Sequence, residues 1–289
     1  MKNYYDISGD GGSNILEQVG AMHAAIAERL AGVKHKLAIG SGKGGVGKST
    51  LTRQLATALR RRGNGCAILD ADLNGPTQAR LSGLQQVPLL PGAEGVAYPR
   101  DSDGVGVVSL GSIFPETEAV QFDSVASGDS FTWRATREFT ALAELLGSIE
   151  WGELDYLLVD LPPGAERTFQ FAEFLGTDTD FILVTVPSDL ARGVVSRSVA
   201  ALNETPNRLL GYVENMKGYW CDDCQAVRPL FPEQENVDLG IERLGSVPFD
   251  PELAAACDRG ESPTGIERPW WVAVDRLAEA VEMKIEEPK

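Results

Sequence analysis

The sequence is poor in cysteine, histidine and basic residues. Its 289 residues include 4 cysteines and 2 histidines, and 26 Lys and Arg stand against 42 Asp and Glu, which gives a net charge of -16. Four cysteines do not form a disulfide framework, and this usage is typical of a reducing cytosol, so we expect a cytoplasmic protein. A sequence-independent nucleic-acid binder needs a positive field, so no nucleic-acid partner is expected.

Long hydrophobic runs are also missing. No stretch approaches the roughly 18 uninterrupted apolar residues that a membrane-spanning helix needs. The polar, acidic start of the sequence does not have the pattern of a secretory signal. We therefore expect no membrane partner. The composition, with 43% hydrophobic and 24% charged residues, supplies a buried core and excludes wholesale disorder.

Short apolar runs alternate with segments of helical periodicity along most of the chain. Strands are expected at Lys36–Gly40, Ala67–Asp70, Val105–Leu110, Tyr156–Asp160, Phe181–Val186, Leu209–Val213 and Leu244–Val247. Helices are expected at Ser49–Arg62, Thr136–Leu146, Arg167–Leu175, Leu190–Leu202 and Trp270–Met283. Wholly apolar strands indicate burial on both faces. The alternation therefore predicts an α/β fold with a mostly parallel central sheet flanked by helices on both faces.

No internal repeat and no clear linker divides the main part of the chain. We expect an N-terminal tail and amphipathic helix over residues 1–33, with the helix at Asn14–Ala31, followed by one domain over residues 34–289. Two segments are predicted to be irregular insertions in that domain. Gly83–Asp103 is rich in Gly and Pro, and Phe114–Phe131 is acidic and rich in Ser.

A phosphate-binding pattern follows the first expected strand and opens a helix. Residues Gly42 to Ser49 match G-x-x-x-x-G-K-[ST], and the strand–loop–helix context is the one that this motif requires. The glycines let backbone N–H groups turn toward phosphate oxygens, and the helix N-terminus adds its positive end. We expect Lys48 to reach the β/γ-phosphates of ATP and Ser49 to hold Mg²⁺. The predicted nucleotide-binding residues are Gly42, Lys43, Gly44, Gly45, Val46, Gly47, Lys48, Ser49 and Thr50.

Lys43 is a second lysine within this loop. A lysine just after the first glycine is similar to the deviant Walker A subgroup of P-loop NTPases. In that subgroup the lysine crosses a dimer interface and neutralises charge at the partner's nucleotide, much as an arginine finger does. The resemblance implies a catalytic role for Lys43 and hydrolysis that depends on a homodimer.

Acidic residues stand at the ends of two further strands. Asp70 and Asp72 end the strand after the phosphate loop, and Asp160 ends a later one. Ligands bind at the carboxyl ends of strands in open parallel sheets, so these groups share an edge with the phosphate loop. We interpret Asp160 as the Walker B carboxylate near Mg²⁺ and Asp70 as a support for the metal's waters. Asp72 is placed to orient the attacking water or accept its proton.

Cys221 and Cys224 form a single C-x-x-C pair. A closed tetrahedral zinc site or a [4Fe–4S] cluster usually takes four protein ligands, and no second pair exists in the chain. Two chains that each give two sulfurs at a twofold axis would complete such a site. A redox-active dithiol and two incidental surface cysteines are the alternatives that spacing leaves open.

Several blocks in this order resemble the Mrp/NBP35 (ApbC) family of P-loop ATPases that carry iron–sulfur clusters. The resemblance covers roughly residues 36–260, and the C-x-x-C just after Asn-Met separates it from other proteins with this phosphate loop. The blocks are Ser41 to Thr50, Leu69 to Thr77, Trp151 to Tyr156, Asp160 to Gly164, Glu214 to Met216 ahead of the two cysteines, and Val247 to Pro251.

The resemblance implies a function for the cysteine pair and for one asparagine. In the family the pair holds a labile [4Fe–4S] cluster between two subunits, which implies metal ligation by Cys221 and Cys224. The asparagine of the Asn-Met pair contacts the adenine base, a role that falls on Asn215. The implied protein is a slow, dimer-dependent ATPase that carries a cluster from scaffold proteins to client apo iron–sulfur proteins.

The chain departs from the family at three places. Ala165-Glu166-Arg167 stands where the family has Thr-Gly-Asp after Pro-Pro-Gly, in the segment expected to follow nucleotide state. Trp133-Arg134-Ala135-Thr136 stands for Trp-Arg-Gly-Pro. After the cysteines, the usual Gly-rich run is replaced by the acidic segment Gln225–Gly240.

Other classes of ATPase share the phosphate loop. A septum-site or partition ATPase of the MinD/ParA type uses a basic C-terminal amphipathic helix or a positive DNA-binding surface, whereas residues 279–287 here are acidic. An electron-donating reductase bridges a cluster with cysteines far apart in sequence. A regulatory ATPase without a cluster is the third alternative.

Overall fold

The computed structural model describes residues 15–113, 131–231, 239–263 and 267–287. Its helices are α1 (Ile15–Arg29), α2 (Lys48–Arg61), α3 (Gln78–Leu81), the 3-10 helix η2 (Leu110–Ser112), α4 (Phe131–Ser148), α5 (Ala165–Leu175), α6 (Asp189–Leu202), α7 (Pro251–Asp258) and α8 (Pro269–Glu286). None of these described helices combines the length and apolar character needed to cross a membrane.

The strands form one large sheet and one small one. They are β1 (Val33–Ser41), β2 (Cys66–Asp70), β3 (Leu90–Pro91), β4 (Val96–Ala97), β5 (Gly106–Val108), β6 (Leu154–Asp160), β7 (Thr179–Thr185), β8 (Leu209–Cys221), β9 (Ala226–Arg228) and β10 (Arg243–Phe249). The large sheet has the order β10-β8-β7-β1-β6-β2-β5, with parallel pairing along that path. β9 pairs antiparallel with β8, and β3 pairs with β4.

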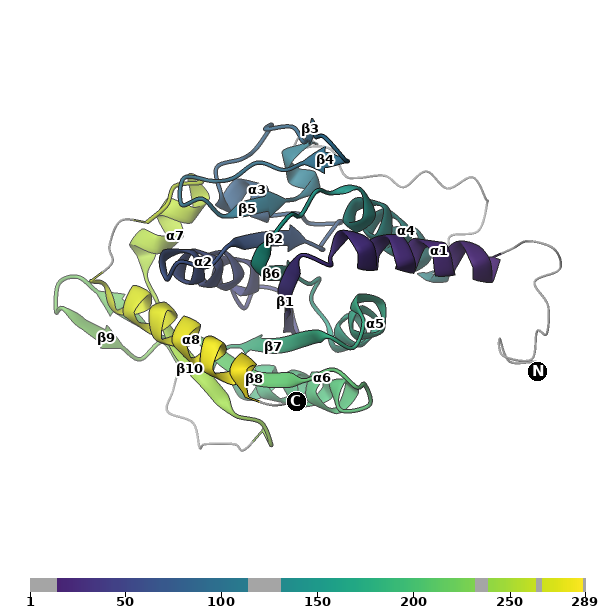
Figure 1. Cartoon of the computed structure of the whole chain (residues 1–289). Helices are drawn as coiled ribbons and strands as arrows, with labels where there is room; N and C mark the ends of the chain where they lie inside the picture. Colours follow the sequence, from purple (N-terminus) through teal and green to yellow (C-terminus); the bar gives the residue numbers. More distant parts are fainter. Residues whose placement is uncertain (1–14, 114–130, 232–238, 264–266, 288–289) are drawn as a thin grey trace.

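Helices cover both faces of the large sheet, as Figure 1 shows. Helices α2, α7 and α8 pack on one face, and α4, α5 and α6 pack on the other, where α1 lies against α4. Alternate residues of a strand enter opposite cores: Leu37 and Ile39 of β1 face the α2 side, and Ala38 between them faces the α4 side. Burial on both faces is the physical reason that the strands read as continuous apolar runs.

The central position of β1 creates the place for a ligand. β1 lies between β6 and β7, and the chain leaves it toward β2 on one side before it returns to the other. Such a reversal of strand order opens a crevice at the carboxyl ends of the strands. The phosphate loop follows β1 and therefore lies in that crevice. The α/β fold predicted from the sequence is confirmed.

Several boundaries differ from those expected. β8 runs as far as Cys221 and not only to Val213, so Asn215 and the first cysteine of the pair lie within this strand. The strand continues because β10 and β9 supply hydrogen-bonding partners for its second half, where the apolar run has ended. The insertion Gly83–Asp103 contains β3 and β4. Most of the insertion Phe114–Phe131 lies outside the described residues.

Candidate functional site

The phosphate loop is a tight turn between β1 and α2. Gly45 and Gly47 adopt φ angles of 77° and 78°, a left-handed conformation that suits glycine. A Cβ on Gly47 would also lie 2.3 Å from the side-chain amide of Asn215, so a larger residue there would displace the Asn215 side chain. Gly164 donates a backbone hydrogen bond of 2.8 Å to Ser41, which ties the loop after β6 to the start of the phosphate loop.

A cavity of about 260 Å³ lies over this loop. It is lined by Ser41, Lys43, Gly44, Gly45, Val46, Gly47, Lys48, Ser49, Thr50, Asp72, Gly75, Thr77, Leu81 and Pro163. The loop thus contributes backbone N–H groups, two lysines and a serine hydroxyl to one hollow, with one carboxylate opposite them. This donor-rich lining suits a polyphosphate. Gly42, which begins the sequence pattern, is not among the lining residues.

Lys48 and Asp160 form a buried ion pair at the floor of the site. The Lys48 ammonium donates to Asp160 Oδ1, and the two side chains are 7% and 0% exposed. Gln78 Nε2 donates to Asp160 Oδ2 at 2.8 Å, and Thr52 Oγ1 donates to Oδ1 at 3.3 Å. The carboxylate predicted as Walker B is therefore held by three side chains beside the phosphate loop.

Asp70 lies next to Asp160, because the two residues are register partners across β2 and β6. Its carboxylate is fully buried. Asp70 Oδ2 accepts hydrogen bonds of 2.9 Å from the N–H groups of Thr77 and Gln78 and from the hydroxyl of Ser109. Burial, followed by the charge of Asp160, raises the pKa of Asp70 to about 7. In the structure this carboxylate organises the loop that follows β2, and its support of Mg²⁺ stays a prediction.

Asp72 lines the cavity at the start of that loop. Its N–H donates to Asp70 Oδ1 at 3.3 Å, and its carbonyl accepts from Gly75 at 3.1 Å. Burial raises the pKa of Asp72. The charges of Asp160 and Glu138 add to the rise, and Lys48 opposes it. Asp72 and Lys48 both line the cavity, so the carboxylate and the ammonium belong to the same hollow.

Asn215 lies against the phosphate loop from the other side. Its side-chain Nδ2 donates a hydrogen bond of 2.9 Å to the carbonyl of Val46. Met216, the next residue, adopts a φ of 56°. For a non-glycine residue, that conformation costs on the order of 1–3 kcal/mol. The strand that leads to the cysteines therefore bends immediately after its contact with the phosphate loop.

The C-x-x-C pair lies at the tip of the β8–β9 hairpin, which projects from the body of the protein (Figure 1). Cys221 is the last residue of β8 and pairs with Ala226 of β9, while Cys224 lies in the turn and is exposed. All four cysteines are free thiols, and Cys66 and Cys257 are buried. Only the predicted pair is thus placed to meet another molecule.

The thiol of Cys224 has a polar environment that favours its ionised form. A hydrogen bond from Cys221 and a hydrogen bond of 3.2 Å from Arg228 Nε lower the pKa of Cys224. Burial has the opposite effect on Cys66, whose pKa it raises to about 12, and it also raises the pKa of Cys257. A thiolate is the form that binds a metal. No cluster of three or more metal-ligating side chains occurs among the described residues.

Arg268 fixes the cysteine turn to the body of the protein. It pairs with Asp222, between the two cysteines, at 3.1 Å, and with the buried Asp250 at 2.6 Å. Asp250 caps α7 by accepting from the N–H groups of Glu252 and Leu253. Arg268 also lies 5.9 Å from the ring centroid of Trp220. The turn is therefore attached to a helix N-terminus.

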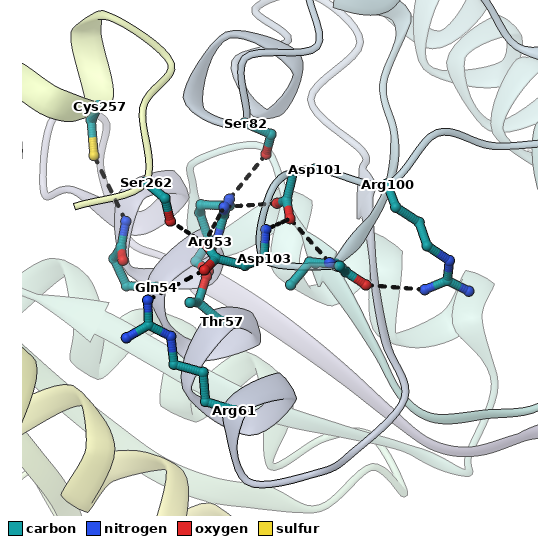
Figure 2. A network of polar contacts seen from close by, with 12 residues as sticks. Arg53, Gln54, Thr57, Arg61, Ser82, Arg100, Asp101, Asp103, Cys257 and Ser262 are labelled. Atoms are coloured by element: carbon teal, nitrogen blue, oxygen red, sulfur yellow. Dashed lines mark hydrogen bonds and ion pairs between the residues drawn. The ribbon is translucent and has the colours of Figure 1, made fainter. Parts of the chain in front are cut away.

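A second polar network holds α2 in place behind the phosphate loop (Figure 2). The buried Arg53 of α2 pairs with Asp101 at 2.7 Å and with Asp103 at 3.1 Å, and it donates to Ser82 at 3.1 Å. Ser262 donates to Asp103 from the segment after α7. The end of the insertion Gly83–Asp103, predicted to be irregular, is thereby anchored to the nucleotide-site helix.

Sequence reasoning missed residues that complete the site. Gln78 binds Asp160 and also donates to the carbonyl of Ser49 at 3.0 Å. Its position directly after the Leu69 to Thr77 block was the feature of the sequence that could have indicated a role in the site. Nothing in the sequence pointed to Ser109, because it reaches Asp70 only through the pairing of β5 with β2. Glu138 also binds Arg167, and it accepts a hydrogen bond from Asn74, two residues after Asp72.

A parallel sheet of this order, with a glycine-rich loop between β1 and α2 and a Lys48–Asp160 pair, defines a P-loop NTPase. Solved structures agree. A nucleotide-binding protein from Archaeoglobus fulgidus, in complex with ADP, is similar with a TM-score of 0.70 and 30% identity over 86% of this chain and 95% of that one. The cell division ATPase MinD of Pyrococcus furiosus has a TM-score of 0.60 over 86% and 98%, and at 22% identity it shows the fold alone.

The family model described as ParA, NUBPL iron-transfer P-loop NTPase matches residues 32–282, and the chain belongs to this family. An iron–sulfur cluster carrier protein of Saccharolobus solfataricus is 31% identical, over 85% of this chain and 81% of the relative. Another from Methanocaldococcus jannaschii is 33% identical over 82% and 80%. The cytosolic Fe-S cluster assembly factor cfd1 of Neurospora crassa is 34% identical over 81% and 80%.

Proposed function

We propose that this protein is an ATP-dependent iron–sulfur cluster carrier. It binds Mg-ATP in the cavity over the phosphate loop and hydrolyses it slowly as a homodimer. Two copies hold one [4Fe–4S] cluster between their cysteine pairs and pass it from scaffold proteins to apo iron–sulfur proteins. The cytoplasmic location expected from the cysteine usage stays a prediction.

The nucleotide half of the proposal follows from the residues around the cavity. The loop from Gly42 to Thr50 binds the phosphates, and Lys48 exchanges its pairing with Asp160 for the β/γ-phosphates. Ser49, Asp160 and, less directly, Asp70 present the hard oxygen donors that Mg²⁺ prefers. Bound Mg²⁺ would neutralise charge on the phosphates. Asp72 orients the attacking water, and Asn215 contacts the adenine base.

Lys43 gives the proposal its dimer dependence. It lines the cavity and makes no ion pair with any residue that the structure describes. We assign it to the nucleotide of the partner copy, where a lysine neutralises the charge that develops as the phosphoryl bond breaks. This assignment extends the similarity to the deviant Walker A subgroup.

The cysteine pair is the single observation that carries the cluster half. Cys221 and Cys224 lie on an exposed hairpin tip, and Arg228 favours the thiolate form of Cys224. One chain brings two sulfurs, whereas a [4Fe–4S] cluster takes four. A twofold axis between two hairpins supplies the other two. A cluster shared in this way is releasable, because any change in dimer geometry strains all four bonds.

Anaerobic reconstitution with iron and sulfide tests the cluster half. We expect about four iron and four sulfide ions per dimer, with the visible absorbance of iron–thiolate bonds. Cys221→Ala and Cys224→Ala abolish cluster binding and transfer to an apo protein, and nucleotide binding persists. Cys66→Ala and Cys257→Ala are the matched controls and keep the cluster. One cluster per monomer, or a cluster that survives Cys221→Ala, contradicts the bridging arrangement.

Mixed dimers test the nucleotide half. Lys43→Ala and Asp72→Asn each suppress hydrolysis and keep much of the ATP affinity. A heterodimer of the two variants has one intact site, which combines the Asp72 of one chain with the Lys43 of the other. Hydrolysis therefore returns on mixing. A mixed, dimeric sample without recovery contradicts the action of Lys43 in the partner site.

A further inference from the structure

Glu138 of α4 accepts hydrogen bonds from the loop after β2 and from the first turn of α5. Its Oε1 accepts from Asn74 Nδ2, and its Oε2 pairs with the guanidinium of Arg167. The Glu138 and Arg167 side chains are 11% and 17% exposed. At this degree of burial an ion pair is only weakly screened by solvent, so the three side chains form a bridge with a defined geometry.

The two ends of this bridge lie in different functional segments. Asn74 belongs to the turn that Asp72 and Gly75 close by a backbone hydrogen bond of 3.1 Å, and Asp72 lines the nucleotide cavity. Arg167 lies in the first turn of α5, three residues after Gly164, in the segment that follows Asp160. The bridge therefore joins the loop after β2 to the start of α5, the helix that follows β6.

Arg167 is itself held in place by aromatic rings. Its guanidinium lies 5.5 Å from the ring centroid of Phe139 and 5.7 Å from that of Phe171, and it donates to Gln170 at 3.1 Å. Such contacts fix the plane of the guanidinium. Any displacement of the α5 N-terminus is therefore transmitted to Glu138, and from Glu138 to Asn74.

We propose that Glu138 is a positioning residue for ATP hydrolysis, which holds the Asp72 turn in register with the α5 N-terminus through Asn74 and Arg167. The inference rests on the hydrolytic part of the proposed function. The Asp72 loop keeps its other anchors, since Asp70 binds Thr77 and Gln78 and Leu73 is buried in the core. Loss of the bridge therefore misplaces Asp72 without unfolding its loop.

Steady-state ATP hydrolysis by full-length variants tests this role. Glu138→Ala lowers kcat about tenfold and leaves KM within about twofold, because the misplaced group acts on the reacting water and not on nucleotide binding. Glu138→Gln keeps an acceptor oxygen for Asn74 but turns an amide NH2 group toward Arg167, so it recovers kcat only in part. Asn74→Ala lowers kcat in the same way. The double variant Asn74→Ala/Glu138→Ala is no slower than Glu138→Ala alone, because the two residues act through one contact.

Asp180→Ala is the matched control. Asp180 of β7 pairs with Arg208, the residue before β8, at 2.9 Å, with side chains 6% and 20% exposed. Its loss lowers thermal stability and leaves kcat unchanged. A wild-type kcat in both Glu138→Ala and Asn74→Ala overturns the proposal. An equal fall of kcat in Asp180→Ala at an equal loss of stability also overturns it.

Hydrogen exchange supplies a readout that does not depend on turnover. Arg167→Ala accelerates amide exchange in residues 72–77, the loop that Arg167 reaches through Glu138. Unchanged exchange in that loop overturns the bridge even if ATP is hydrolysed normally. A wild-type protein that binds ATP without hydrolysing it contradicts the proposed ATPase and, with it, the hydrolytic role of Glu138. The exchange result in that case still decides whether the bridge exists.

Discussion

The side-chain amide of Asn215 donates a hydrogen bond of 2.9 Å to the backbone carbonyl of Val46. Val46 belongs to the phosphate loop, and Asn215 lies on the strand that ends six residues later at Cys221. A strand rises about 3.3 Å per residue, so roughly 20 Å of backbone joins this contact to the first cysteine. One strand thus connects the nucleotide site to the hairpin that carries the thiols.

Asn215→Ala removes the donor to the Val46 carbonyl. The loss of a buried hydrogen bond costs about 1.4 kcal/mol, so we expect nucleotide affinity to fall about tenfold as the phosphate loop loosens. Asn207→Ala is the control, because Asn207 is also 9% exposed and donates to two backbone carbonyls remote from the loop. Titration with a fluorescent nucleotide measures both variants. Equal affinities in the two variants would refute the expectation.

Lys48→Ala leaves the Asp160 carboxylate buried without its charged partner. We expect a loss of about 3 kcal/mol in unfolding free energy, together with the loss of nucleotide binding. Lys48→Ala/Asp160→Asn recovers most of the stability, because the uncompensated charge is gone, but it does not recover binding. Urea denaturation at pH 7 without nucleotide measures the difference. A double variant no more stable than Lys48→Ala would show that the charge is not the cause.

The four thiols should differ in their alkylation as pH rises. Cys224 reacts at a lower pH than an ordinary thiol, because Cys221 and Arg228 lower its pKa and increase the thiolate fraction. Cys66, with a pKa raised to about 12 by burial, stays unmodified until the protein unfolds. Pulsed iodoacetamide labelling of the metal-free protein, read by mass spectrometry, gives each profile.

Arg228→Gln provides the control for these profiles. It shifts the alkylation of Cys224 to higher pH, because the guanidinium that favours the thiolate is gone, and it leaves Cys66 and Cys257 unchanged. An unshifted Cys224 profile in this variant would contradict the role of Arg228.

Arg268→Ala detaches the cysteine turn from Asp250. We expect faster amide exchange across residues 219–228 and a moderate fall in stability, since Asp250 is fully buried and loses its charged partner. Arg259→Ala is the comparison, because Arg259 and Glu261 form an exposed pair that contributes little. Hydrogen exchange with mass spectrometry resolves the hairpin. Equal exchange in the two variants would argue against Arg268 as the anchor.

The sequence by itself determined the phosphate loop, because its glycines, lysine and serine are close neighbours in the chain and form the phosphate site within a single turn. It also determined the parallel sheet, since burial on both faces leaves continuous apolar runs in the central strands. The end of β8 could not be predicted from the sequence. Beyond Val213 that strand mixes polar and apolar residues, and its partners β9 and β10 lie later in the chain.

The tertiary structure alone decided which polar groups meet at the site. Asp70 and Asp160 are 90 residues apart in sequence but are register partners, and burial together with the charge of Asp160 raises the pKa of Asp70. In the sequence, Glu138 is one charged residue of a predicted helix. Only the packing of α4 brings it beside Asn74 and Arg167. Local spacing encodes a phosphate loop, whereas contacts between side chains far apart in the chain exist only once strand order and helix packing are fixed.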